Sequence, residues 1–246
     1  MKMTQVFKAL GPIDARNVRR DTLVNWMIFI PFLTAFFIRW ALPPLSHGVL
    51  VRYGLDLIPY YPLILSFFFI LLNPLLFGMV IGMLLLDERD DHTLTALQVT
   101  PLSLNNYLVY RISAPILLAV AITIAIYPIA NLGVMNFKAL LVAAAAASPM
   151  VPIFALALSS IAQNKVQGFA LMKISGTFLM PPLIAFFIHS PWELAFGLFP
   201  TYWPVKAYWL AEAGSPGVWL YVLFGLLYQG FLLWLLVRRF NKIMHN

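Results

Sequence analysis

The sequence predicts an all-α integral membrane protein, with six transmembrane helices in a single domain, residues 1–246. Of the 246 residues, 62% are hydrophobic and 10% are charged, whereas soluble domains average about 45–50% apolar and 25% charged residues. Apolar runs also recur along the chain, each near or above the ~20 residues that a helix needs to cross the hydrocarbon core. We place the six spans at residues 22–42, 59–86, 107–131, 139–162, 168–188 and 217–237.

Residues 1–21, which precede the first span, indicate an amphipathic interfacial helix. Apolar Val6, Phe7 and Leu10 occur there together with the basic residues Lys8 and Arg16, as in helices that lie in the headgroup plane of a membrane. No small-residue cleavage site follows the first span, so we expect this segment to be retained.

The second span has a disturbance in its middle. Residues 57–86 carry no charge, and a helix of that length would reach about 45 Å, which exceeds the hydrocarbon thickness. Pro74 lies in the middle of this stretch and removes one backbone hydrogen bond. We therefore expect a kink or break, with the side chain of Asn73 available to satisfy a freed backbone group.

The segment before the sixth span, residues 189–216, is rich in aromatic residues, including Trp192, Trp203 and Trp209. Such density is typical of the water–lipid boundary. It is also compatible with a re-entrant segment, in which short helices dip back into the outer leaflet.

The basic residues indicate how the spans are oriented. Of the 16 Lys and Arg residues, only Arg39, Arg52, Lys138 and Lys206 fall on the side opposite to the two termini. Because short cytoplasmic loops carry an excess of Lys and Arg, we expect both termini and the loop after the second span to be cytoplasmic. Membrane orientation thus explains the net charge of +7, and no nucleic-acid partner is expected, since that would need a basic soluble face.

The loop at residues 87–101 opens with four carboxylates, on Asp87, Glu88, Asp90 and Asp91. Acids at the start of a short helix complement the positive end of its dipole. We therefore expect a short helix that begins at these residues. Two alternatives remain at this point, namely a solvated loop without a partner and a metal site that adds His92 to the aspartates.

The remainder of the loop gives this helix one apolar side. Thr93, Leu94 and Leu97 form a small edge at helical spacing, and Pro101 ends the helix. We therefore expect the loop as a whole to be a compact acidic helix with a small apolar surface.

The order of these residues carries a resemblance. The pattern consists of Asp87-Glu88-Arg89-Asp90-Asp91, Thr93-Leu94, Thr100-Pro101-Leu102-Ser103 and Tyr107-Leu108. It resembles the permease family of the second class of ABC exporters, although His92 stands where glycine commonly precedes Thr-Leu. The early stretch GPIDARNVRRDTLVNWM also resembles bacterial permeases of the fluoroquinolone-export type.

The resemblance implies that the loop is a coupling helix seated on a separate ABC ATPase subunit, which would hold ATP and magnesium. The implied ATPase-coupling residues are Asp87, Glu88, Asp91, Thr93, Leu94, Leu97 and Pro101. It further implies a second permease subunit, as a homodimer or heterodimer, and a place in the bacterial inner membrane.

The sequence motifs of several enzyme classes do not occur in this chain. No G-x-x-x-x-G-K-[ST], H-E-x-x-H or G-x-S-x-G pattern occurs, so we expect a transport subunit that is not an enzyme and binds no cofactor itself. The absence of cysteine excludes disulfides and thiolate metal sites. The middle of each span also lacks the ionisable residues that ion-coupled carriers keep there.

An uncharged path favours an amphipathic cargo, either a drug-like molecule or a lipid. In the resembled family the second and fifth spans line this path. The residues that they would place there are Phe68, Asn73, Phe77, Thr177, Phe178 and Met180. A secondary carrier driven by an ion gradient and a non-transporting membrane scaffold remain as alternative functions.

Overall fold

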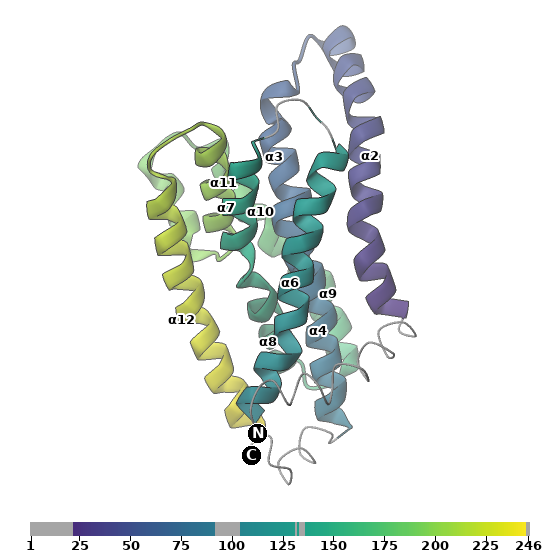
Figure 1. Cartoon of the computed structure of the whole chain (residues 1–246), viewed down its shortest axis with the longest axis vertical. Coiled ribbons are helices and arrows are strands. Elements are labelled where there is room, and N and C mark those ends of the chain that lie inside the picture. The colour runs from purple at the N-terminus through teal and green to yellow at the C-terminus, as the bar shows by residue number, and fades with distance from the viewer. Residues whose placement is uncertain (1–21, 92–103, 131, 133–135, 245–246) are drawn as a thin grey trace.

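The structure is a computed structural model that describes residues 22–91, 104–130, 132 and 136–244. Within these ranges the chain is largely helical and contains no strand (Figure 1). The elements are α2 (Thr22–Tyr53), η1 (Ile58–Tyr60), α3 (Tyr61–Leu65), η2 (Ser66–Leu71), α4 (Leu72–Asp90), α6 (Leu104–Ala130), α7 (Phe137–Ala147), α8 (Met150–Ile161), α9 (Lys165–Ser175), η3 (Gly176–Leu179), α10 (Met180–Ala185), η4 (Pro191–Leu198), α11 (Tyr202–Glu212) and α12 (Val218–Met244).

Six segments of the described chain are long and apolar enough to cross a membrane, which confirms the six-span prediction. They are Ile28–Tyr53, Ile58–Asp90, Asn106–Ala130, Phe137–Ile161, Lys165–Phe186 and Val218–Met244. The start of α2, the end of α4, the start of α6 and the end of α12 lie at one end of the molecule in Figure 1. We call it the Asp90 end, and the opposite one the Tyr53 end.

The first helix, α2, is longer than the predicted first span. The sequence predicts an end at residue 42, but the helix continues through Pro43 and Pro44 to Tyr53. The fixed φ of proline is compatible with a helix. A proline therefore removes backbone hydrogen bonds but does not by itself end the helix. The helix ends instead at Gly54, which has φ 67° and donates its N–H to the carbonyl of Leu50 at 2.9 Å.

The second span is disturbed where the sequence predicts it. Residues 66–71 form a π-helix just before Asn73-Pro74. The carbonyl of Phe69 accepts hydrogen bonds from Asn73 Nδ2 at 3.1 Å and from Thr123 Oγ1 at 3.2 Å. Side chains from α4 and α6 therefore satisfy the carbonyl of Phe69, which lies about one turn before Pro74. This is expected for an interrupted helix in lipid.

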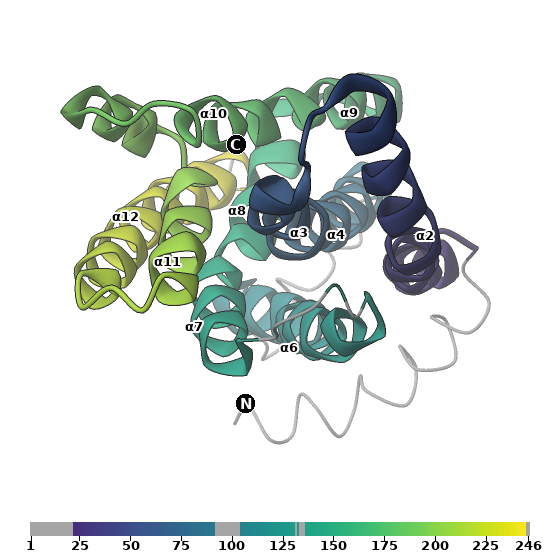
Figure 2. The same ribbon diagram turned by 90° about the horizontal axis from the view of Figure 1, so that it is seen from above.

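The core of the molecule is built around α4. Seen from above, this helix lies among α2, α6, α8 and α9 (Figure 2). Gly78 and Gly82 allow α8 to approach closely, because a Cβ on Gly78 would meet Phe154 Cβ at 2.7 Å and one on Gly82 would meet Leu158 Cβ at 2.9 Å. Small residues four apart favour such packing between membrane helices. The spacing of the two glycines is a local signal for this close packing in the sequence.

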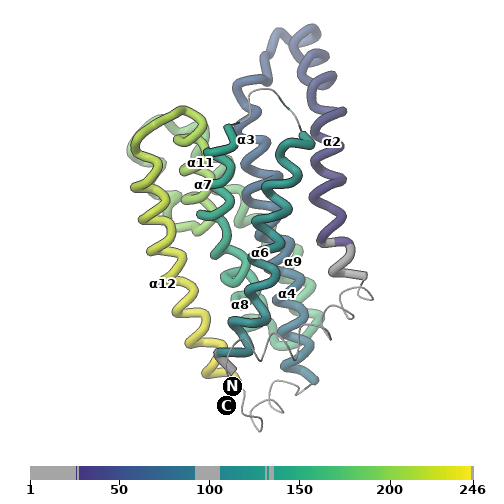
Figure 3. The backbone as a smooth tube through the Cα atoms, in the orientation of Figure 1, coloured from purple at the N-terminus to yellow at the C-terminus, as the bar shows by residue number. Residues whose placement is uncertain are grey.

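The fourth and fifth spans are each interrupted. α7 ends and α8 begins on either side of Ser148 and Pro149 (Figure 3). The hydroxyl of Ser148 donates to the carbonyl of Ala145 at 2.8 Å, which satisfies one acceptor at the break. The fifth span tightens into a 3₁₀ turn at Gly176–Leu179, just before the prolines of α10.

The aromatic segment before the sixth span folds back against that span, as the re-entrant expectation requires. The carbonyl of Leu198 accepts a hydrogen bond from the Tyr228 hydroxyl, and that of Pro200 accepts one from Gln229 Nε2 at 3.3 Å. Both donors lie near the middle of α12. α11 then packs against α7 and α12 on its way to the Tyr53 end (Figure 1).

Candidate functional site

The acidic cluster lies in the last turn of α4. This helix continues to Asp90, so Asp87, Glu88 and Asp90 end a long helix, and the expectation that they begin a separate short helix is wrong. The carbonyl end of a helix disfavours acids. Basic residues compensate for this placement, namely Arg89 of α4 itself, Arg111 of α6 and Lys165 of α9.

Glu88 joins α4 to α6. Its carboxylate accepts a hydrogen bond from the Tyr107 hydroxyl at 2.7 Å and one from Arg111 Nη2. The side chains of Glu88 and Arg111 are each only 17% exposed. A charge-assisted contact that is so well shielded from water is stronger than a surface ion pair, so the second and third spans are fixed to one another at this end.

Asp87 makes a second link, to the start of α9. Its Oδ2 lies 3.1 Å from Lys165 Nζ, and the two side chains are 32% and 56% exposed. An ion pair in such contact with water contributes little to stability. It nevertheless sets the direction in which the Asp87 carboxylate points.

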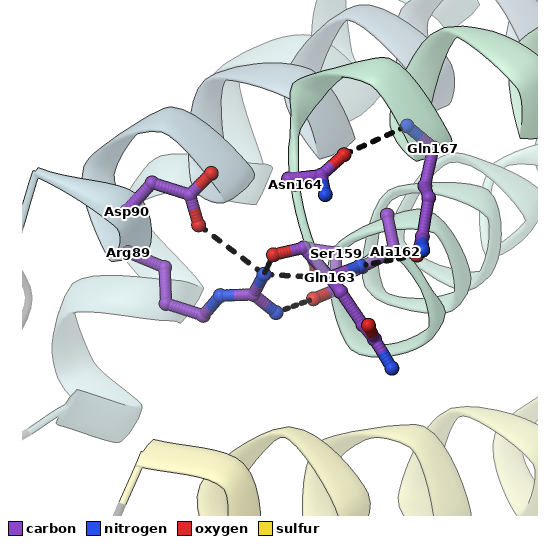
Figure 4. A network of polar contacts seen from close by, with 7 residues as sticks. All are labelled: Arg89, Asp90, Ser159, Ala162, Gln163, Asn164 and Gln167. Carbon is purple, nitrogen blue, oxygen red and sulfur yellow. Dashed lines mark hydrogen bonds and ion pairs between the residues drawn. The ribbon is translucent and has the colours of Figure 1, made fainter.

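Arg89, the basic residue inside the acidic run, binds the end of α8 (Figure 4). Its guanidinium donates to the carbonyls of Ser159 at 2.8 Å, Ala162 at 2.9 Å and Gln163 at 3.2 Å. It also contacts the Asp90 carboxylate at 3.3 Å. A cation placed over the last carbonyls of a helix satisfies acceptors that lack intrahelical donors and complements the helix dipole.

The turn that follows α8 is itself well ordered by side chains. Asn164 Oδ1 accepts the backbone N–H of Gln167 at 3.0 Å, and Gln167 Oε1 accepts the N–H of Gln163 at 2.9 Å. Asn164 is therefore the N-cap of α9. The end of α4 is thus tied to α6, α8 and α9 together, and we call these contacts the α4 junction.

A cavity of about 500 Å³ lies between α8, α9, the η4–α11 connection and α12. Its lining residues are almost all apolar, and they include Phe178, Leu198, Phe199, Pro200, Leu232 and Arg239. Of the residues predicted to line a substrate path, only Phe178 lines this cavity. Asn73 and Phe77 are fully buried in the core of the single chain.

Comparison with known proteins places the chain in a family. Residues 14–237 match the family described as "Fluoroquinolones export permease protein Rv2686c-like". The chain belongs to this family.

Two relatives within this family come from Mycobacterium tuberculosis. They are the fluoroquinolones export permease proteins Rv2686c of strain ATCC 25618 / H37Rv and MT2760 of strain CDC 1551 / Oshkosh. Each is 33% identical to this chain over 240 residues, which cover 95% of the chain and 93% of the relative. No solved structure matches. The family assignment confirms the resemblance to permeases of the fluoroquinolone-export type.

The predicted coupling residues of this family member are only partly within the described structure. Asp87 and Glu88 are in the α4 junction, and Asp91 is exposed directly after α4. The remaining four, Thr93, Leu94, Leu97 and Pro101, lie outside the described residues, as does His92 of the alternative metal site. Within the described ranges no group of three or more His, Cys, Asp or Glu residues could hold a metal ion.

Sequence reasoning missed the basic half of the α4 junction. The sequence-based prediction used the basic residues to orient the spans. In the structure, the acidic run is contacted by Arg89, Arg111 and Lys165. For Arg89 the sequence held a local signal of such a contact, because this residue interrupts a run of four acids. Arg111 offered a weaker signal, as a charge inside the predicted third span.

Proposed function

We propose that this chain is the membrane-spanning permease subunit of an ATP-driven ABC exporter that moves an amphipathic compound out of the cell. The observation that carries the proposal is the family match over residues 14–237, together with six apolar helices of membrane-spanning length. The two relatives are named for export of fluoroquinolones, which are drug-like compounds. ATP and magnesium would be held by a separate ATPase subunit, and a second permease subunit would complete the transporter.

The distribution of charge supports a cytoplasmic location for the Asp90 end. Basic residues make contacts at the end of α4, namely Arg89, Arg111 and Lys165, and the last turns of α12 carry Arg238, Arg239 and Lys242. Cytoplasmic loops carry such an excess in multi-pass proteins of the cell membrane. The ATPase subunit would then contact residues 87–101 from the cytoplasm.

The α4 junction gives this contact a mechanical consequence. A force applied to the segment after Asp90 acts on the end of α4, and Glu88 and Arg89 connect that end to α6 and to the last turn of α8. Closure of two ATPase subunits would therefore move three helices together. Coupling needs such stiffness, because a loosely attached loop would deform without moving the spans.

The junction also divides the acidic run into two roles. Glu88 and Arg89 are engaged within the chain, so their substitution perturbs folding as well as any partner contact. Asp91 is exposed at the end of α4 and is the better probe of partner binding. Leu94 and Leu97, as the predicted apolar edge, would complete the contact.

The test is to purify the tagged chain from native membranes in mild detergent and to identify co-purifying subunits by mass spectrometry. We expect a stoichiometric subunit with a phosphate loop. Asp91→Lys should reduce its recovery severalfold at an unchanged melting temperature, whereas Asp91→Glu, the matched control, should retain it. Glu88→Gln should lower the melting temperature itself.

Two results would contradict the proposal. If no phosphate-loop subunit co-purifies with the wild-type chain in several mild detergents, the ATP-driven model is contradicted. The alternative of a non-transporting membrane scaffold is then favoured. Export that follows an imposed proton gradient without ATP would favour the secondary carrier.

A further inference from the structure

The 500 Å³ cavity has two chemically different ends. Toward mid-height of α12 it is lined by Leu198, the last residue of η4, and by Phe199 and Pro200, which lie between η4 and α11. Toward the Asp90 end it is bordered by Ile161, the last residue of α8, and by Arg239, in the last turns of α12. The cavity thus extends over the half of the molecule nearer the Asp90 end.

The end near mid-height of α12 is held by side chains that bind the backbone of this part of the lining. The Thr201 hydroxyl donates to the carbonyl of Phe178 at 2.8 Å. Tyr228 and Gln229 donate to the carbonyls of Leu198 and Pro200. These contacts fix the backbone of the cavity wall at this end.

Arg239 is the charged residue of this lining. The other polar lining groups are engaged, since Ser175 donates to the Met172 carbonyl at 2.6 Å and Tyr228 donates to Leu198. Arg239 makes no hydrogen bond or ion pair with another described residue. Its neighbour Arg238 differs, because its guanidinium lies 3.8 Å from the centre of the Trp234 ring and does not line the cavity.

We infer that this cavity binds an amphipathic anion of drug-like size, with the apolar body against α8, α9 and α12 and an acidic group on Arg239. The volume falls within the ~300–1,000 Å³ of typical small-molecule pockets. A guanidinium pairs well with a carboxylate or sulfonate, in a two-pronged contact that gains strength beside apolar walls. The same cation repels a cationic ligand, and no acid lines the cavity to offset it.

As a substrate site, this inference rests on the proposed export function and refines it, since it names the chemical class of the cargo. The ligand would enter from the cytoplasmic half of the bilayer, with its acidic group at headgroup level and its apolar body toward mid-membrane. Binding itself requires only this chain. It can therefore be tested without the ATPase subunit, and failure to find that subunit would leave the binding result standing.

The experiment uses the full chain in nanodiscs of zwitterionic phosphatidylcholine, with 1-pyrenebutyrate as the anionic probe and 1-pyrenebutanol as its neutral counterpart. Binding is followed by fluorescence anisotropy, with empty discs as the correction for partition into lipid. We expect saturable binding of the anion, weakened about tenfold or more by Arg239→Gln, as loss of one charge-assisted contact predicts. Arg238→Gln, the matched control, should change the affinity less than about twofold.

Two further measurements separate charge from shape. The neutral alcohol should bind more weakly than the anion and should be insensitive to Arg239→Gln. Ala157→Trp, which fills the cavity from α8, should abolish binding of both probes. Melting temperatures of all variants establish that each is folded.

Three outcomes would overturn the inference. Equal losses for Arg238→Gln and Arg239→Gln would mean a general attraction of the helix end for anions. Unchanged binding in Ala157→Trp would place the probe elsewhere. Loss of binding in discs that contain phosphatidylglycerol would mean that an anionic lipid, rather than a drug-like anion, occupies the cavity.

Discussion

Replacing Arg89 tests the α4 junction most directly. In Arg89→Met the side chain keeps much of its apolar length but loses the guanidinium that lies over the end of α8. The carbonyls of Ser159, Ala162 and Gln163 then lose a charged donor. The α8 dipole loses its nearest described cation at the same time.

The expected cost follows from these contacts. A hydrogen bond to a charged group contributes about 1.5–3 kcal/mol, and a cation at a partly buried helix end contributes up to about 2 kcal/mol. The side chain is 15% exposed, so water can replace part of the donors at this end of the molecule. We therefore expect a net loss of about 2–4 kcal/mol, well below the sum of the separate contributions.

The assay is thermal unfolding of the purified chain in one detergent. At about 2–4 °C per kcal/mol for a chain of this size, Arg89→Met should lower the melting temperature by about 4–16 °C. Arg89→Lys should give an intermediate loss, because it keeps the charge without the planar fork. Arg238→Met, which removes only an exposed stacking contact, should cost about 1 kcal/mol or less. Equal small shifts for Arg89→Met and Arg238→Met would refute the capping role.

Three further predictions concern the packing and the polar links. Gly82→Leu should destabilise the chain by about 1–3 kcal/mol through overpacking against α8, whereas Gly230→Leu, at a glycine with open space around it, should be nearly neutral in the same melting assay. Asn73→Leu should cost about 1–2 kcal/mol, because a backbone carbonyl beside Pro74 loses one donor; an unchanged melting temperature would mean that the remaining hydroxyl donor is sufficient. Glu88→Gln and Arg111→Gln should each destabilise, and the double variant should lose less than the sum of the single losses; strict additivity would show that the ion pair has no energetic coupling.

Much of the architecture could be predicted because hydropathy reports membrane spans almost directly. A helix in lipid must satisfy its own backbone, so a long apolar run admits few other structures. The same reasoning located the disturbance at Asn73-Pro74. It failed at the end of α2, because a pair of prolines marks a loss of hydrogen bonds and does not by itself mark the end of a helix.

The contacts of the acidic run could not be predicted in the same way. Glu88 and Arg111 are 23 residues apart, and Arg89 lies 70 to 74 residues from the carbonyls that it binds. Such pairs depend on which helices become neighbours, which hydropathy leaves open. The acids were therefore assigned wholly to an external partner, although the chain itself supplies basic groups for Asp87 and Glu88.

The α4 junction and the cavity share α8 and α9, and this bears on how a signal could cross the chain. Arg89 binds the carbonyls at the end of α8, while Leu158 and Ile161 of the same last turns line the cavity. Movement of α4 at the Asp90 end would thus reach the cavity wall in part through α8, which Gly78 and Gly82 allow to pack closely against α4. A rigid α4–α8 pair transmits displacement to the wall, whereas a flexible one would absorb it. Under the proposed function, Arg89→Lys should therefore reduce export by more than its loss of stability explains, because it keeps the charge at the end of α8 but loosens the connection.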